Sequence, residues 1–174
     1  MAAARRKVGR DHHEGAVATY IPTLATADPN WFAVCAAGVD GTVQTAGDVD
    51  VAFSIQSISK AFVYALVCEG FGHEAVRDRV GVNNTGFPFN SVIAIELNDG
   101  HPMNPMVNAG ALATTAMMPG RTPAEQWEQI RAGLSAFAGR QLELDGEVYA
   151  CEAATNHRNQ AIARLLQSYG RIES

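Results

Sequence analysis

A serine and a lysine three residues apart stand directly before the longest apolar run of the chain. The segment from Phe53 to Gly72 reads FSIQSISKAFVYALVCEGFG, and its apolar run extends from Ala61 to Cys68. Residues three apart share one face of a helix, so we expect Ser57 and Lys60 to meet at the start of this helix. Because the run carries no charge, the helix must be enclosed in a core, and the rest of the fold must form around it.

The two side chains suit nucleophilic catalysis. A serine hydroxyl attacks a carbonyl only when a base takes its proton, and the first turn of a helix offers free N–H groups to a developing oxyanion. A lysine becomes such a base when burial lowers its pKa, whereas an arginine stays protonated. The chain has only two lysines, Lys7 and Lys60. The alternative is structural: Ser54 or Ser57 caps the helix, and Lys60 extends its ammonium group into water.

Composition excludes several classes of function. The net charge is -5, and no basic stripe with interleaved aromatic residues is present, so nucleic acid is not an expected partner. No Cys/His spacing typical of a metal site occurs, and we expect no metal and no cofactor. The apolar run is too short to span a bilayer, and no apolar segment of a signal peptide follows the first residues. We therefore expect no membrane association and a cytoplasmic location.

Cysteine usage agrees with a reducing compartment. The three cysteines, Cys35, Cys68 and Cys151, are an odd number, lie far apart and have alanine or valine neighbours. This pattern predicts buried free thiols.

Local patterns predict the order of the elements. Residues 1–14 form a polar tail that we expect to be mobile, and residues 15–174 form the domain. Pro22 should break or restart a helix over 16–25, and Asp40-Gly41 is typical of the tip of a β-hairpin. Further helices are predicted over 73–79, 109–118, 122–138 and 152–169, the third with Thr122 and Glu125 as a capping box. Loops are predicted over 80–90 and 101–108, a strand or turn over 91–97, and a loop or strand over 141–149.

Several segments of the chain together resemble one family, the serine-dependent glutaminases, which share the fold of the serine β-lactamases. They are GAVATYIPTLA, FSIQSISKAF, GFPFNSVIAIE, HPMNPMVNAGAL and VYACEAATNHRNQAIA. NPMVNAGA and the serine-lysine segment are specific to the glutaminases rather than to the wider superfamily. The resemblance implies a mixed α/β fold in which helices pack on an antiparallel sheet, with the C-terminal strands of that sheet missing from this chain.

The resemblance also implies roles for individual residues. Ser57 would be the nucleophile and Lys60 the base in hydrolysis of L-glutamine, and no cofactor would be needed. We also expect a homo-oligomer, because the unpaired strand edges of the hairpin invite association with other chains. The substrate would be bound by Ser57, Tyr20, Gln56, Asn108, Glu152 and Asn159. A carboxylate suits an α-ammonium group, and amides can donate to an α-carboxylate. Glu152 and Asn159 lie seven residues apart, so on one helix they would face the same cleft.

Two departures from the family's pattern stand out. Cys151 occupies a position where the family commonly has serine, and the turn at 83–86 differs in sequence. The resemblance covers nearly all of this chain but little over half of a full glutaminase. Two alternatives therefore stay open: a non-catalytic fragment of a glutaminase, and an acylase of the β-lactamase or penicillin-binding kind. A β-lactamase should carry an S-D-N-like motif, and none is found.

Overall fold

The described residues form two compact units. The computed structural model describes residue 3 and residues 15–173, so nearly all of the tail predicted to be mobile lies outside the described residues. The first unit comprises residues up to Ser54 together with Asp145–Thr155, and the second comprises Ile55–Leu144 and the residues from Asn156 onward. Among the described residues, no helix is both long and apolar enough to cross a membrane.

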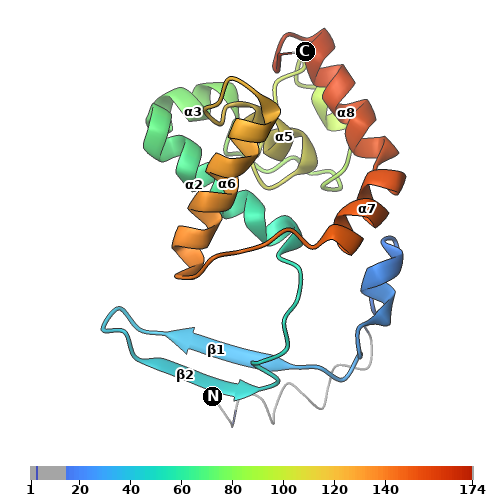
Figure 1. Cartoon of the computed structure of the whole chain (residues 1–174). Coiled ribbons are helices and arrows are strands. Elements are labelled where there is room, and N and C mark those ends of the chain that lie inside the picture. The colour runs from blue at the N-terminus through green and yellow to red at the C-terminus, as the bar shows by residue number, and fades with distance from the viewer. Residues whose placement is uncertain (1–2, 4–14, 174) are drawn as a thin grey trace. The chain divides into compact units, whose positions relative to one another are not determined.

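The first unit contains the predicted hairpin. Strands β1 (Ala33–Ala37) and β2 (Val43–Gly47) pair antiparallel in a two-stranded sheet, with Cys35 opposite Thr45 (Figure 1). At its tip Gly41 has φ +82°, a conformation that favours glycine, and Asp40 accepts a hydrogen bond from the backbone N–H of Thr42 at 3.0 Å. That bond and one from the Thr42 hydroxyl lower the pKa of Asp40.

Most of the hairpin is exposed, and this corrects one prediction. The expectation of buried thiols is wrong for Cys35, which is exposed, whereas Cys68 and Cys151 are half-buried. Only Val34 of β1 and Ala46 of β2 are partly buried, and the described residues add no further strand to this sheet.

The helix predicted over 16–25 is wrong before the proline. Residues 15–19 have no regular structure, and the 3-10 helix η1 (Pro22–Thr26) begins at Pro22. The residue before a proline is pushed toward extended backbone, and Ile21 accordingly has φ -117° and ψ 114°. Ile21 is nevertheless almost completely buried, with 1% of its surface exposed.

The last predicted helix is in fact two helices. α7 (Gly146–Thr155) belongs to the first unit, and α8 (His157–Ser168) belongs to the second. The hydroxyl of Thr155 donates back to the carbonyl of Cys151 at 3.1 Å, and Asn156 accepts from the side chain of Gln160 at 2.6 Å. At Asn156 the backbone leaves the helical conformation, with φ -82° and ψ 24°, and the Asn156 side chain does not cap α8.

The second unit is built around the helix predicted from the apolar run. The 3-10 turn η2 (Gln56–Ile58) leads directly into α2 (Ser59–Phe71), which packs against α3 (His73–Arg79), α5 (Asn108–Ala116) and α6 (Pro123–Ala138) (Figure 1). Val63 and Val67, four residues apart, point into one core. The other buried members of this core are Val76, Met118, Ile130 and Leu134.

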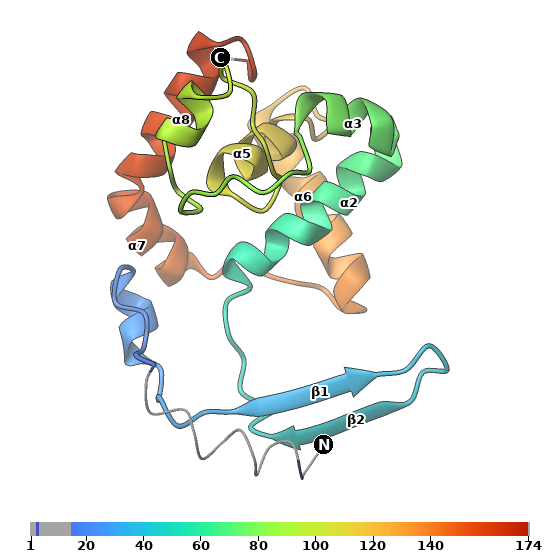
Figure 2. The same cartoon turned by 180° about the vertical axis from the view of Figure 1, so that it is seen from behind.

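A second core lies on the other side of α5. There α5 packs against α8, so that α5 contacts both α2 and α8 (Figure 2). Its buried members are Ile95, Ala109, Ile162 and Leu166. Ile95 lies in the short helix α4 (Ile93–Glu96), so the segment predicted as strand or turn is helical.

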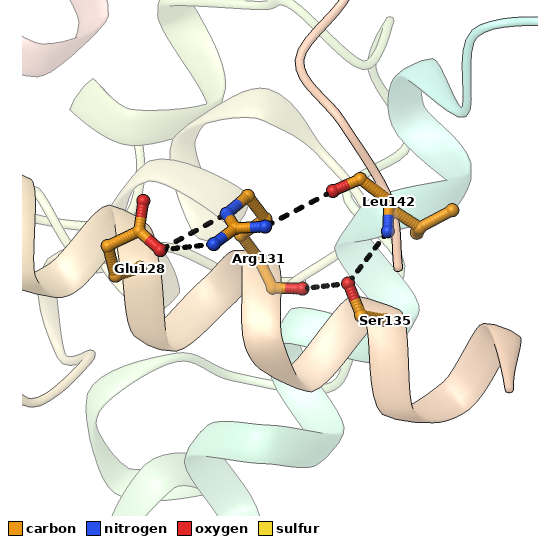
Figure 3. Close-up of polar contacts among 4 residues, drawn as sticks. All are labelled: Glu128, Arg131, Ser135 and Leu142. Carbon is orange, nitrogen blue, oxygen red and sulfur yellow. Dashed lines mark hydrogen bonds and ion pairs between the residues drawn. The ribbon is translucent and has the colours of Figure 1, made fainter. Parts of the chain in front are cut away.

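Helix α6 begins and ends with local signals that the sequence carries. Thr122 caps it by accepting from the N–H of Glu125 at 3.2 Å, and Gly139 ends it in the left-handed conformation at φ +64°. Near its C-terminal end the Ser135 hydroxyl donates to the Arg131 carbonyl at 2.7 Å and accepts from the N–H of Leu142 at 3.0 Å (Figure 3). These bonds fasten the following segment to the helix.

Candidate active site

The proposed nucleophile lies in the turn that precedes α2. Ser57 is the middle residue of η2 and is exposed. The residue before it, Gln56, has φ +45°, which an L-residue with a side chain adopts only under constraint. The Gln56 carbonyl accepts two hydrogen bonds from Ser59, one from its backbone N–H and one from its hydroxyl at 2.7 Å. The turn is thus held in a strained conformation at the residue adjoining Ser57.

Lys60 lies in the first turn of α2 and is half-buried. Its Nζ donates to Asn108 Oδ1 at 2.7 Å and to the Met106 carbonyl at 3.1 Å. It also lies 5.8 Å from the centre of the Phe89 ring, within range of a cation–π contact. Burial lowers the pKa of Lys60, which is the direction that a lysine base requires.

Asn108, the first residue of α5, links this lysine to α8. Its Nδ2 donates to Asn159 Oδ1 at 2.7 Å, and its backbone N–H donates to the Phe89 carbonyl at 2.8 Å. The orientation of both amides follows from chemistry, because an ammonium group only donates. The side-chain oxygen of Asn108 must therefore face Lys60 and its nitrogen must face Asn159. Asn159 must accept that second bond with its oxygen.

The orientation of the Asn108 and Asn159 amides determines which ligand groups the site can bind. The Asn108 amide keeps one free N–H, while neither N–H of the Asn159 amide is used in this chain of bonds. Both side chains are half-buried, so these donors are reachable. The free groups of the pair are donors, which suit an acceptor such as a carboxylate.

Of the predicted site residues, the structure brings together Lys60, Asn108 and Asn159. Ser57 precedes Lys60 by three residues as predicted, but among the described residues no hydrogen bond joins their side chains; the lysine instead donates to Asn108 and Met106. Catalytic contacts are often loose before substrate binds. The pairing therefore stays a prediction.

Tyr20 and Glu152 belong to the first unit. Tyr20 lies just before η1 and is 69% exposed, and Glu152 is half-buried on α7. η1 packs on α7, where the Thr23 hydroxyl lies 3.1 Å from Cys151 Sγ and donates to Glu147 at 3.3 Å. The prediction that Glu152 and Asn159 share a helix face is wrong, because Glu152 lies on α7 and Asn159 on α8.

Two contacts of the site were not predicted. The Met106 carbonyl and the Phe89 ring both meet Lys60. A signal for the first existed, since Pro102 and Pro105 prevent regular structure in this loop and leave its carbonyls free to bond elsewhere. Within the described residues, no group of three or more His, Cys, Asp or Glu side chains could hold a metal ion.

Known proteins resemble this chain over almost all of its length. The family model of the glutaminases matches residues 15–174. Glutaminase 2 of Yersinia pestis is 49% identical over 158 residues, which are 91% of this chain and 46% of that protein. A glutaminase of Brucella abortus strain S19 is 46% identical over 165 residues, 95% of this chain and 52% of the relative. The chain thus spans about half the length of these relatives.

Solved structures agree. The probable glutaminase ybaS superposes with a TM-score of 0.89 at 40% identity, covering 99% of this chain and 58% of the other. A probable glutaminase from Bacillus subtilis, complexed with 6-diazo-5-oxo-L-norleucine, gives a TM-score of 0.82 at 31% identity, with 97% and 50% covered. The predicted mixed α/β, β-lactamase-like fold class is confirmed by these neighbours. With the family model matching from residue 15 to residue 174, the chain belongs to the glutaminase family.

Proposed function

We propose that this chain carries the nucleophile, the base and part of the substrate site of an enzyme that hydrolyses L-glutamine to L-glutamate and ammonia. The Ser57 hydroxyl attacks the side-chain carboxamide carbon while Lys60 takes the hydroxyl proton. The tetrahedral intermediate expels ammonia, which leaves with the proton from Lys60, and water then hydrolyses the acyl ester of Ser57. The observation that carries this proposal is the half-buried Lys60, whose pKa burial lowers, one turn after an exposed serine.

The substrate contacts follow from the free hydrogen-bonding groups. The unused N–H groups of Asn108 and Asn159 suit the α-carboxylate of an amino acid, and the Glu152 carboxylate suits its α-ammonium group. Tyr20 and Gln56 are the remaining residues proposed to bind substrate. One relative is complexed with 6-diazo-5-oxo-L-norleucine, an amino acid with a reactive diazo ketone, which supports an amino-acid ligand.

The test is ammonia release from glutamine by this chain and by a version extended to the length of its relatives. We expect Ser57→Ala to bring ammonia release in the extended protein to background. Ser168→Ala is the matched control, because that hydroxyl only donates to the Leu165 carbonyl at the end of α8. Ammonia release unchanged in Ser57→Ala would reject the proposal.

Covalent labelling tests the nucleophile without turnover. 6-Diazo-5-oxo-L-norleucine should add to Ser57, and peptide mass spectrometry would locate the adduct. The label should be absent from Ser57→Ala and present in Ser168→Ala. An adduct on another residue in the unmodified sequence would assign the nucleophile elsewhere.

We further propose a cytoplasmic homo-oligomer. The free thiols of Cys35, Cys68 and Cys151 are typical of a reducing compartment. Large apolar side chains are exposed in the first unit, among them Trp31, Val43 and Phe53 at 50%, 61% and 79%. Such residues are often covered by association. Light scattering coupled to size-exclusion chromatography would measure the oligomeric state.

A further inference from the structure

We infer that Asn108 is a positioning residue for Lys60: its side-chain oxygen, in an amide whose plane is fixed by the bond to Asn159, holds the ammonium group and controls how readily the proposed base loses its proton. The inference rests on the proposed function for the role of Lys60 and adds to it. In that function Asn108 binds substrate. Here it also acts on the catalytic machinery through Lys60.

The oxygen of Asn108 is held from two sides. The backbone N–H of Asn108 donates to the Phe89 carbonyl at 2.8 Å, and its amide nitrogen donates to Asn159 Oδ1 at 2.7 Å. These bonds fix the start of α5 and the direction of the amide plane. Rotating the amide by half a turn would place N–H groups against the ammonium of Lys60 and break both side-chain bonds. The ammonium of Lys60 therefore prevents the flip, and the bond to Asn159 fixes the plane of the amide.

Lys60 depends on a few neutral acceptors. The bond to Asn108 is 2.7 Å long and the bond to the Met106 carbonyl is 3.1 Å long. Both favour the charged lysine, whereas burial favours the neutral lysine. The acceptor and the desolvation thus oppose each other, and a change at Asn108 shifts the balance between them.

No charged group competes with Asn108 for this control. Besides Lys60, the charged or titratable residues on α2 and on the helices packed against it are Tyr64, Cys68, Glu69, His73, Glu74, Arg77, Asp78, Arg79, Glu125, Glu128 and Arg131. Helix α5 has none. Among the described residues, none of them forms an ion pair with Lys60, and burial is the cause given by the structure for its lowered pKa.

The experiment reads the protonation of Lys60 directly. Brief acetylation with acetic anhydride over a range of pH, followed by peptide mass spectrometry, gives the midpoint for each lysine. Because the chain has only Lys7 and Lys60, Lys7 serves as the internal reference in every sample. In the unmodified sequence we expect the Lys60 midpoint to lie below 10.5, the ordinary value for a lysine.

Two substitutions of similar size move the midpoint in opposite directions. Asn108→Asp keeps an acceptor and adds a negative charge within hydrogen-bond distance, so the Lys60 midpoint should rise by about 1 to 3 pH units. Asn108→Leu removes the acceptor and leaves the burial, so the midpoint should fall. Asn159→Leu frees the Asn108 amide and should lower the midpoint by less than Asn108→Leu does.

Asn98→Asp is the matched control for added charge, because the Asn98 amide donates to the His101 carbonyl at 2.8 Å and not to Lys60. A midpoint in Asn108→Asp equal to that in Asn98→Asp would overturn the inference. So would a midpoint in Asn108→Leu equal to that of the unmodified sequence. Circular dichroism shows whether each variant keeps its helices. If Asn108→Leu does not fold, the comparison of the Lys60 midpoints in Asn108→Asp and Asn98→Asp tests the inference alone.

The outcome is separable from that of the proposed function, since acetylation needs no turnover. If Ser57→Ala leaves ammonia release unchanged while Asn108→Asp shifts the Lys60 midpoint, the proposed function fails and Asn108 still controls the lysine. If Ser57→Ala abolishes ammonia release and the Asn108 variants leave the midpoint in place, the proposed function stands and this inference fails.

Discussion

The hydroxyl of Ser59 donates to the carbonyl of Gln56 at 2.7 Å, across the residue proposed as nucleophile. The same carbonyl accepts from the backbone N–H of Ser59. Gln56 itself has φ +45°. The turn that carries Ser57 is therefore closed by side-chain and backbone bonds around a strained residue, and strain of this kind often marks a functional site.

The strain at Gln56 predicts that variants with glycine and with alanine at this position differ in stability. A side chain with a Cβ in the left-handed conformation costs about 1 to 2 kcal/mol, a cost that glycine avoids. We therefore expect Gln56→Gly to unfold with a free energy about 1 kcal/mol higher than Gln56→Ala. Both variants lose the glutamine side chain, so its own contacts cancel. Urea unfolding followed by circular dichroism measures the difference; equal stabilities would mean that the turn relaxes at no cost.

Substitution of two helical glycines by alanine should change the stability of the fold in opposite directions. At Gly110 of α5 an added Cβ would overlap the carbonyl of Asn104, whereas at Gly70 of α2 nothing lies within 4 Å. Gly110→Ala must displace the loop next to Asn108 and should cost about 1 to 3 kcal/mol. Gly70→Ala should stabilise by up to about 1 kcal/mol, because alanine has the higher helix propensity. Thermal unfolding of the pair tests this; stabilisation by both would show that the loop yields freely.

Local signals predicted those elements whose partners lie close along the chain. The hairpin follows from Asp40-Gly41 between two apolar segments, and α6 follows from Thr122 and Glu125. The helix expected over 152–169 is wrong because its amphipathic pattern continues across Thr155 and Asn156, whereas the backbone leaves the helix at Asn156, which has φ -82° and ψ 24°. Helix propensity tolerates both residues inside a helix, so it does not predict this break.

The candidate site likewise has features that the sequence alone predicts and features that depend on contacts between distant parts of the chain. The spacing of Ser57 and Lys60 is visible in the sequence, although Ser57 lies in the 3-10 turn η2 and only Lys60 lies in α2. Asn108 and Asn159, separated by 51 residues, meet only through the packing of α5 on α8, and their inclusion came from the resemblance to a family. For the contact of Lys60 with the Met106 carbonyl, the sequence carried only a general signal: Pro102 and Pro105 leave the carbonyls of this loop free, but nothing singles out that of Met106.

Ser135 should be the most sensitive polar residue of α6. Its hydroxyl is buried and satisfies both the Arg131 carbonyl and the Leu142 N–H (Figure 3). Ser135→Ala leaves the Leu142 N–H without this partner, which should cost about 1 to 3 kcal/mol. Ser168→Ala, at an exposed hydroxyl that only donates to a carbonyl, is the control and should change little. A Ser135→Ala variant as stable as the control would mean that water replaces the hydroxyl.

The ion pair between Glu128 and Arg131 should contribute little stability at neutral pH and lose that contribution in acid. Hydrogen bonds from Arg131 lower the pKa of Glu128 from its ordinary 4.5. A carboxyl whose pKa is lower in the folded state adds stability above the unfolded value, and that stability is lost as pH falls through the folded value. Both groups are solvated, so Glu128→Gln should reduce stability only slightly at pH 7 and not at all in acid. A deficit that grows in acid would contradict the assignment.

Lys60→Arg separates a base from a structural cation. An arginine keeps the charge and can still donate to Asn108, but it cannot take the serine proton at neutral pH. In a chain extended to the length of its relatives, we expect Lys60→Arg and Lys60→Met to lower kcat alike, by at least about 100-fold. A cation that only organises Asn108 and Met106 would be replaced by arginine, and the arginine variant would then release ammonia far faster than the methionine variant.

Glu152→Gln tests how the α-ammonium group of glutamine is read. The substitution keeps size and one acceptor but removes the charge, so a charge-assisted bond becomes a neutral one, with a loss of about 1 to 2 kcal/mol. We expect KM for glutamine to rise about 10-fold with a smaller change in kcat. Glu147→Gln is the matched control on the same helix, since Glu147 accepts from Thr23 at the junction of α7 with η1.

A substrate without the α-amino group shows whether Glu152 binds that group or has another role. If Glu152 binds the ammonium, the original protein and Glu152→Gln should hydrolyse that substrate equally poorly. A protein that hydrolyses it as well as it hydrolyses glutamine does not use the α-ammonium group, and Glu152 then has another role.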